Sequence, residues 1–358
     1  MAKRASFGMR QSGFSIIEIM IALTLGLFIL GGILYVFIGS RTVFVSNDAV
    51  AKIQEDGRMA MERLTREIRQ AGFMGCSNSL DITPRIIADP DHDGNSAEHV
   101  TFVPGDGIQA FDNGVGWVNS TGITRILGTD VIQIKGLSTC TAKLDGKMTT
   151  DNANIQIAAN PCGWAAGQVL VIADCTNVDI FAATNVSSSA GKVTIAHANS
   201  RNTDEKLSKA FGKEAVVFGY GEKTFFIGNH PTLNIPMLYE TAYDGTATTT
   251  NDVVANVYDL QVMSTFADTN ADSVPDSNVF STCAPASWPC DAQSDPVPTL
   301  GAVTWLQALA MQVRFSVRSE SDNTGPASMT YKFNGASVTD KRIKRNFTTV
   351  VGIRNRLP

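Results

Sequence analysis

The sequence of 358 residues lacks the common short motifs of catalytic and nucleotide-binding sites. It contains no HExxH, GxSxG or Walker A motif, and no GxGxxG that opens a helix. Its four histidines are scattered, and cysteines that are all paired in disulfides would leave no thiol nucleophile. These absences exclude the usual hydrolase, kinase and dehydrogenase signatures. We therefore expect that the protein is not an enzyme.

Positive charge is also scarce. The chain has 29 Lys and Arg against 34 Asp and Glu, a net charge of −5, and removing the three cations of residues 1–13 leaves −8. Such a balance argues against specific nucleic-acid binding. The C-terminal segment, residues 341–358, is basic, with six Lys or Arg and no acid. Its alternating pattern favours an exposed strand face or a subunit contact over binding to DNA or lipid.

One long segment has no charge at all. Ile19 to Ile38 is twenty uncharged residues, and as a helix it spans about 30 Å, the thickness of a bilayer core. The basic, acid-free leader before it places the N-terminus in the cytoplasm. No small-residue cleavage site follows the apolar run, as a secretory signal would require. A plain membrane anchor would leave Glu18, at the edge of the run, unexplained.

The residues around Glu18 resemble a known processing site. Gly13-Phe14-Ser15-Ile16-Ile17-Glu18 is similar to the cleavage motif of type IV prepilins and type II secretion pseudopilins. The resemblance implies that a prepilin peptidase cuts between Gly13 and Phe14 and that Phe14 is N-methylated. It also implies that Glu18 pairs with the N-terminus of a neighbouring subunit during assembly. Residues 1–13 are then a cleaved leader, and residues 14–38 the transmembrane and polymerisation half of a helix.

The helical pattern continues beyond the apolar run. Apolar residues from Val50 to Ile68 recur every three or four positions, and charged residues, Glu67 included, occupy the other face. Residues 39–72 are therefore the amphipathic half of the helix, with Gly72 suited to its C-terminal cap. Residues 73–358 are expected to form one β-rich domain outside the cytoplasm. The fold class is α+β and type IV pilin-like, with a long N-terminal helix packed on an elaborated, mostly antiparallel sheet.

Several short segments have the composition or alternation of β-strands. Residues 76–104 and Thr241 to Asn256 instead have the polar composition of loops. The expected strands are Asp130–Lys135, Asn154–Ala158, Gln168–Ala173, Lys192–Ala196, Glu214–Tyr220, Lys223–Ile227, Tyr258–Val262, Met311–Val317 and Phe347–Ile353.

All six cysteines follow the apolar run, on the side away from the cytoplasm. An even number of cysteines in an oxidising compartment favours disulfides, and many connectivities are open. The short, Pro-containing interval supports Cys283–Cys290. Cys162–Cys175 across a hairpin is a guess, and Cys76–Cys140 follows by elimination. No CxxC occurs, so a zinc site is not expected.

Two acidic segments have oxygen ligands at alternate positions, as at the start of a calcium loop. One contains Asp268, Asn270, Asp272 and Asp276, and the other contains Asp89, Asp91 and Asp93. Neither has Glu at the twelfth position, and Asp and Asn also favour ordinary solvated turns. Calcium is thus a candidate ligand, not a required cofactor. His92 and His99, close to the second segment, are either metal ligands or ordinary surface-loop histidines.

Later segments narrow the resemblance. Val257–Val262 with the acidic loop Asp268–Asp272, the ending Lys341–Arg356, and Ala71–Cys76 all resemble the PilW family of minor pilins. The resemblance implies a complex at the pilus tip with other minor pilins, the major pilin and a PilY-type adhesin. It implies handling by the prepilin peptidase and the inner-membrane assembly platform. The expected roles are initiation of pilus biogenesis, twitching motility, adhesion and DNA uptake, first at the inner membrane and then at the cell surface.

Two other functions stay open at this point. A J-type pseudopilin of a type II secretion system has the same N-terminal motif. A membrane-anchored periplasmic module that binds a glycan or another ligand would need the anchor but would not polymerise. Glu18 separates the anchored binding module from the pilins and pseudopilins, because only a polymerising helix needs a carboxylate at that position.

Overall fold

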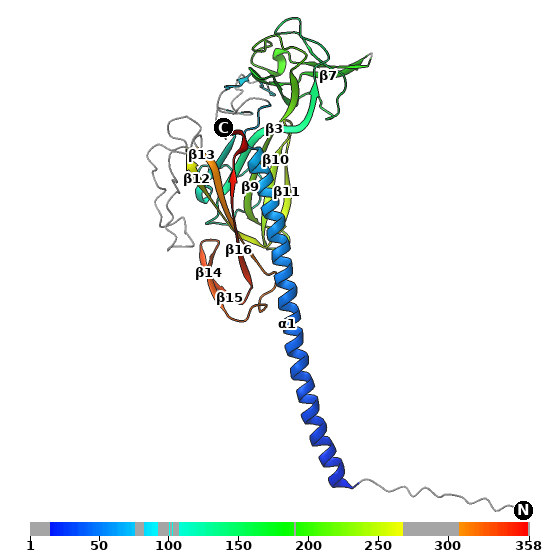
Figure 1. Cartoon of the computed structure of the whole chain (residues 1–358), viewed down its shortest axis with the longest axis vertical. Helices are drawn as coiled ribbons and strands as arrows, with labels where there is room; N and C mark the ends of the chain where they lie inside the picture. The colour runs from blue at the N-terminus through cyan, green and yellow to red at the C-terminus, as the bar shows by residue number, and fades with distance from the viewer. Residues whose placement is uncertain are drawn as a thin grey trace, which may run out of the picture.

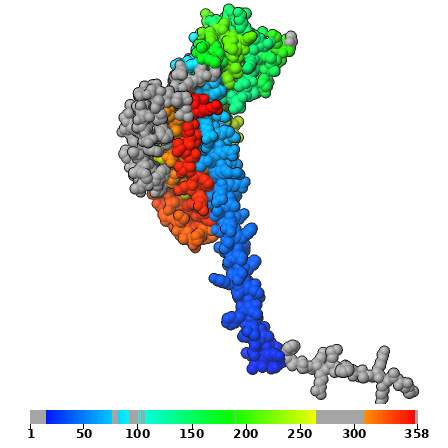
Figure 2. Space-filling view, viewed as in Figure 1, coloured from blue at the N-terminus to red at the C-terminus, as the bar shows by residue number. Residues whose placement is uncertain are grey.

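The computed structural model describes residues 15–75, 82–91, 100, 102, 107–189, 191–267 and 308–356. A single long helix, α1 (Ile16–Gln70), runs from a free N-terminal half into a β-rich region (Figure 1). The N-terminal half of α1 stands clear of that region, while its C-terminal half lies against it (Figure 2). This arrangement confirms the expected α+β fold, in which one long N-terminal helix packs on a mostly antiparallel sheet domain.

The sequence of α1 explains where it packs and where it ends. The buried positions Ile53, Leu64 and Ile68 follow the helical spacing of the amphipathic half. Gly72 adopts a positive φ of 68°, which glycine accepts without strain, and its N–H donates to the Lys135 carbonyl at 2.9 Å. The predicted end of the helix near Gly72 is thus confirmed.

The strands lie in four sheets among the described residues. The largest has the order β1–β6–β5–β9–β10–β11, with β3 also paired to β9 and β2 paired to β3. All of its pairs are antiparallel except β1–β6. The others are β12–β13–β16, β14–β15 and β4–β8–β7. The bounds are β1 Arg85–Ile86, β2 Ile108–Phe111, β3 Val131–Lys143, β4 Ile155–Ile157, β5 Val169–Ala173, β6 Val178–Ala182, β7 Asn185–Ser189, β8 Lys192–Ala196, β9 Val216–Asn229, β10 Pro236–Tyr243, β11 Thr248–Ala255, β12 Val257–Ala267, β13 Ala308–Arg318, β14 Met329–Phe333, β15 Ala336–Asp340 and β16 Lys344–Gly352, with 3₁₀ turns at Asp112–Gly114, Asn199–Arg201 and Arg354–Arg356.

A predicted loop and a predicted break between two strands are wrong in an informative way. The segment Thr241–Asn256 is not a loop: its residues complete β10 and form β11, the edge strand of the large sheet. Strand β11 pairs with β10 on one side and with no described strand on the other, and most of its side chains are exposed. Its residues can therefore be polar. Glu214–Tyr220 and Lys223–Ile227 are likewise one continuous strand, β9, and the glycines between them do not break it.

Strand β9 joins two apolar cores. Its residues Phe225 and Ile227 belong to the core beneath α1, whereas Val217 belongs to a second core formed with β4, β5 and β8. We call the part of the molecule around the second core, residues 144–215, the distal lobe. It lies beyond the C-terminal end of α1, at the opposite end of the molecule from the free half of the helix (Figure 1).

The amphipathic half of α1 is held against the last strand of the chain. The ring of Phe347 in β16 lies over Gly57, where an added Cβ would come within 2.1–2.5 Å of three ring carbons. The same ring stacks on Phe315 of β13 with a centroid distance of 5.4 Å. Only glycine leaves enough room at position 57 for this close approach of helix and strand.

Charged side chains add a second attachment. An Arg63 guanidinium nitrogen lies 2.6 Å from Oε2 of Glu240 on β10, and Lys223 Nζ of β9 lies 2.7 Å from Oε2 of Glu67. Glu67 and Glu240 are only 6% and 3% exposed. The prediction that Glu67 belongs to the solvent-exposed face of α1 is therefore wrong. The cation on the sheet that pairs with it, Lys223 of β9, is far away in sequence.

The disulfides differ from the expected pairs. Cys140 is bonded to Cys162, with a Cα–Cα distance of 5.7 Å. The proposed pairs Cys76–Cys140 and Cys162–Cys175 are therefore wrong, and Cys175 belongs to another disulfide. Cys140 lies on β3, and the fold brings it within bonding distance of Cys162, 22 residues later in the chain. Cys76, Cys283 and Cys290 lie outside the described residues.

A buried carboxyl group joins the large sheet to the β12–β13–β16 sheet. The Asp130 carboxyl accepts hydrogen bonds from the backbone N–H groups of Asn113 at 2.9 Å and Val262 at 2.8 Å. The Asp130 N–H donates to the Leu260 carbonyl at 2.8 Å. Burial raises the pKa of Asp130 to about 8, although the two N–H donors act to lower it. Burial also raises the pKa of Asp259, which lies on β12.

The raised pKa of Asp130 gives a stability that depends on pH. The folded protein retains a proton that the unfolded chain releases, so stability should fall as pH rises from about 4 to about 8. We expect the substitution Asp130→Asn to remove about half or more of that fall in stability. Stability is measured as the melting temperature of the full chain in detergent at a series of pH values. The exposed Asp48→Asn on α1 is the matched control. An unchanged slope in the Asp130 variant would contradict the prediction.

Candidate assembly helix

Glu18 lies in the first turn of α1. The backbone N–H groups of Glu18 and Ile19 both donate to the Ser15 carbonyl at 3.1 Å, and Ser15 itself is extended. The Glu18 side chain is exposed and forms no ion pair among the described residues. A carboxylate at this end of a helix is favoured by the helix dipole. The helix therefore presents an anion outward, at the start of its apolar surface.

The surface that follows Glu18 is apolar and uncovered. Every residue from 16 to 45 is exposed, including Phe28, Tyr35 and Phe44. The helix contains a segment apolar and long enough to cross a membrane, and none of that segment is buried in the protein. The hydroxyls of Thr24 and Thr42 donate back to helix carbonyls, for example Thr24 to Ile21 at 2.9 Å. Even its hydroxyl groups thus suit a non-aqueous environment.

Four glycines lie in the N-terminal, apolar half of α1. Gly26, Gly31, Gly32 and Gly39 all lie inside the continuous helix, and a Cβ at any of them would meet no atom within 4 Å. They leave open positions along the apolar surface, at which the backbone of another helix can approach closely.

Of the other candidate residues in the two acidic segments, the structure describes Asp89 and Asp91. Asp89 is fully buried and Asp91 is exposed, while Asp93, His92, His99 and the acidic segment Asp268–Asp276 lie outside the described residues. Within the described part of the chain, no group of three or more His, Cys, Asp or Glu side chains is placed to hold a metal ion. Gly13 and Phe14 also lie outside the described residues.

The remaining histidines have structural contacts. His197 is buried, its Nε2 lies 3.0 Å from the Ala153 carbonyl, and its ring packs edge-on against Phe181. His230 Nδ1 accepts the backbone N–H groups of Thr232 and Leu233 in a loop. Neither geometry resembles a catalytic base beside a nucleophile.

Comparison with known proteins identifies the N-terminal segment. Residues 8–34 match the family model described as the prokaryotic N-terminal methylation motif, and the match spans Gly13, Phe14 and Glu18. No curated protein matches the chain. The motif points to a protein of the type IV pilin or pseudopilin kind, which assembles with other pilins and their machinery. Together with the apolar helix, it fits a protein anchored in the inner membrane and later incorporated into a pilus.

Proposed function

We propose that this chain is a minor pilin of the PilW type, which assembles through α1 into a complex at the pilus tip. The observation that carries the proposal is the uncovered helix of residues 16–45, preceded by a methylation motif and starting with Glu18. In the membrane this surface contacts lipid. In a filament the same surface contacts the helices of neighbouring subunits.

Glu18 and the motif residues have specific roles in this proposal. Cleavage after Gly13 creates a new N-terminal ammonium on Phe14, which is then methylated. A carboxylate inside a bundle of apolar helices is strongly unfavourable unless a cation pairs with it. The N-terminal ammonium of an adjacent, staggered subunit provides that cation for Glu18. The pairing sets the relative position of two helices that otherwise could slide along each other.

The distal lobe supports a position at the tip. It extends beyond the C-terminal end of α1, away from the apolar half (Figure 1). Subunits in a filament are stacked along the direction of their helices, so the space beyond the distal lobe is where the head of the next subunit would lie. A bulky head there suits the last subunit, which has no neighbour above it and can instead hold an adhesin of the PilY type.

Isolation of the native complex tests the proposal. The full chain carries a C-terminal affinity tag, is expressed from its own locus, and is purified from detergent-solubilised envelopes after mild crosslinking. We expect other minor pilins, the major pilin and a PilY-type adhesin among the partners identified by mass spectrometry. Recovery of type II secretion pseudopilins in their place would assign the chain to a secretion system and overturn the proposal.

A further inference from the structure

The large sheet has a pocket on the face that is turned away from α1. Along β9 the side chains of Lys223 and Phe225 face the helix, as an ion pair to Glu67 and part of the core, so Glu222 and Thr224 face the other side. The pocket has a volume of about 300 Å³. Residues of five strands and one loop line it: Phe111, Gly116, Trp117, Val118, Ser120, Thr121, Gln133, Glu222, Thr224, Thr241, Tyr243 and Thr248.

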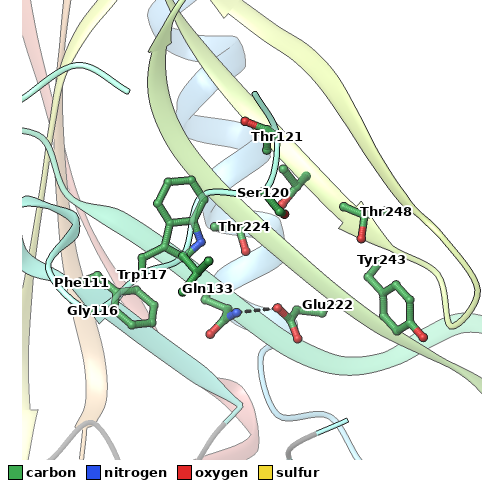
Figure 3. Close-up of a pocket in the computed structure, with 12 residues that line it drawn as sticks. Phe111, Gly116, Trp117, Ser120, Thr121, Gln133, Glu222, Thr224, Tyr243 and Thr248 are labelled. Atoms are coloured by element: carbon green, nitrogen blue, oxygen red, sulfur yellow. Dashed lines mark hydrogen bonds between the residues drawn. The ribbon is translucent and has the colours of Figure 1, made fainter. Parts of the chain in front are cut away.

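The floor of the pocket is polar. Gln133 of β3 donates its side-chain N–H to Glu222 of β9 at 2.5 Å, and this pair lies at the centre of the site (Figure 3). Thr224 and Thr241 are 3% and 8% exposed, and Thr248 lies on the edge strand beside them. Amide, carboxylate and hydroxyl groups from four neighbouring strands therefore converge on one space. Such groups donate and accept hydrogen bonds at short range.

The walls of the pocket are aromatic and fixed in position. Trp117 and Phe111 stand on one side of the Gln133–Glu222 pair and Tyr243 on the other (Figure 3). The Trp117 ring packs on Phe226 with a centroid distance of 5.0 Å, and Phe226 in turn stacks on Tyr239. The Trp117 wall is thus supported by the core of the sheet. A ligand would not have to order it on binding.

We propose that this pocket binds a neutral saccharide unit. A sugar ring has apolar C–H faces that stack on aromatic rings and hydroxyl groups that pair with amides, carboxylates and other hydroxyls. The volume lies at the lower end of the range for small-molecule sites and suits one or two sugar rings. Among the described residues that line the pocket, Glu222 is the one with a charge. Lys135, which pairs opposite Glu222 between β3 and β9, is buried and does not belong to this lining, so the lining offers no cation to an anionic sugar or a phosphate.

The proposal does not depend on the pilin assignment, because the pocket and the assembly helix use separate residues. The test is made with the full chain in a detergent that has no sugar headgroup. The protein is applied to an array of neutral, sialylated and sulfated oligosaccharides, and the best neutral disaccharide is then titrated in free form. We expect binding to neutral glycans alone, with competition by the free disaccharide.

Variants locate the binding site. Trp117→Ala should weaken binding at least about tenfold, since a central aromatic contact is lost. Because Trp117 also packs on Phe226, Glu222→Gln and Thr248→Ala are measured beside it, and each should weaken binding several-fold with the melting temperature retained. The exposed Leu233→Ala, on the loop between β9 and β10, is the control. Unchanged binding in all three pocket variants would overturn the proposal.

Two other outcomes would also overturn it. One is binding to sialylated or sulfated glycans only, which the charge of Glu222 disfavours. The other is a protein occupant of the pocket. To test for it, a photoreactive residue replaces Val118, on the exposed rim, and we expect no crosslink to another pilin in the assembled filament. A crosslink there would show that the pocket is a subunit contact.

Discussion

A strain in which Glu18→Ala replaces the wild-type chain is expected to process its leader normally but to incorporate the protein into pili at least about tenfold less. The reason is that Glu18 is exposed at the first turn of α1, where the uncharged run Ile19–Ile38 begins. In the proposed assembly, removing it leaves the N-terminal ammonium of a neighbour without a partner in an apolar bundle, where an unpaired charge is unfavourable by several kcal/mol. Immunoblots of sheared pili against membrane fractions measure the incorporation.

Two companion variants separate assembly from processing. Gly13→Ala should block cleavage, so that the longer precursor accumulates in the membrane. Glu55→Ala changes an exposed carboxylate on the same helix, outside the apolar segment, and should leave both processing and assembly unchanged. Normal incorporation of Glu18→Ala would contradict the role in assembly that is proposed for this carboxylate.

The second large effect concerns the folded domain. Arg63→Ala should lower the free energy of unfolding by about 3–5 kcal/mol, because it leaves Glu240, 3% exposed, without its bidentate partner. Arg63 also lies 3.3 Å from Glu67, so the change removes a cation from two buried carboxylates. Chemical denaturation of the full chain in detergent, followed by circular dichroism, measures the loss.

Two controls show whether burial is the cause. Lys52 forms an ion pair with Glu320 in which the side chains are 55% and 63% exposed, so Lys52→Ala should lower stability by about 1 kcal/mol or less. The double variant Arg63→Met with Glu240→Leu removes both charges and should recover much of the stability lost in Arg63→Ala. Equal effects of Arg63→Ala and Lys52→Ala would contradict the explanation.

The sequence predicted the features that depend on neighbouring residues. The apolar run, the amphipathic spacing and Gly72 define α1 and its end, and the strand Lys192–Ala196 is found as β8 with the same bounds. Alternation of apolar residues also located β13 and β16. These signals are local, since each depends on a helix or strand period over a few residues.

What the sequence could not predict depends on partners distant in the chain. Glu67 looks like a surface residue until Lys223 of β9 is placed beside it. Thr241–Asn256 looks like a loop because an edge strand needs few apolar residues. The Cys140–Cys162 bond joins residues 22 positions apart that the fold, and no local pattern, brings together. The pocket is found by no motif, because its residues come from five strands and one loop.

The contact between Gly57 and Phe347 has a consequence for the order of events during export. The helix is at the beginning of the chain and β16 is at its end, so the amphipathic half of α1 cannot complete its packing until the last strand has crossed the membrane. Until then α1 can pack only on earlier strands such as β3 and β9, which belong to the same core, and the distal lobe, built from residues 144–215, can already fold. The core beneath α1 is therefore complete only after β16 has been translocated.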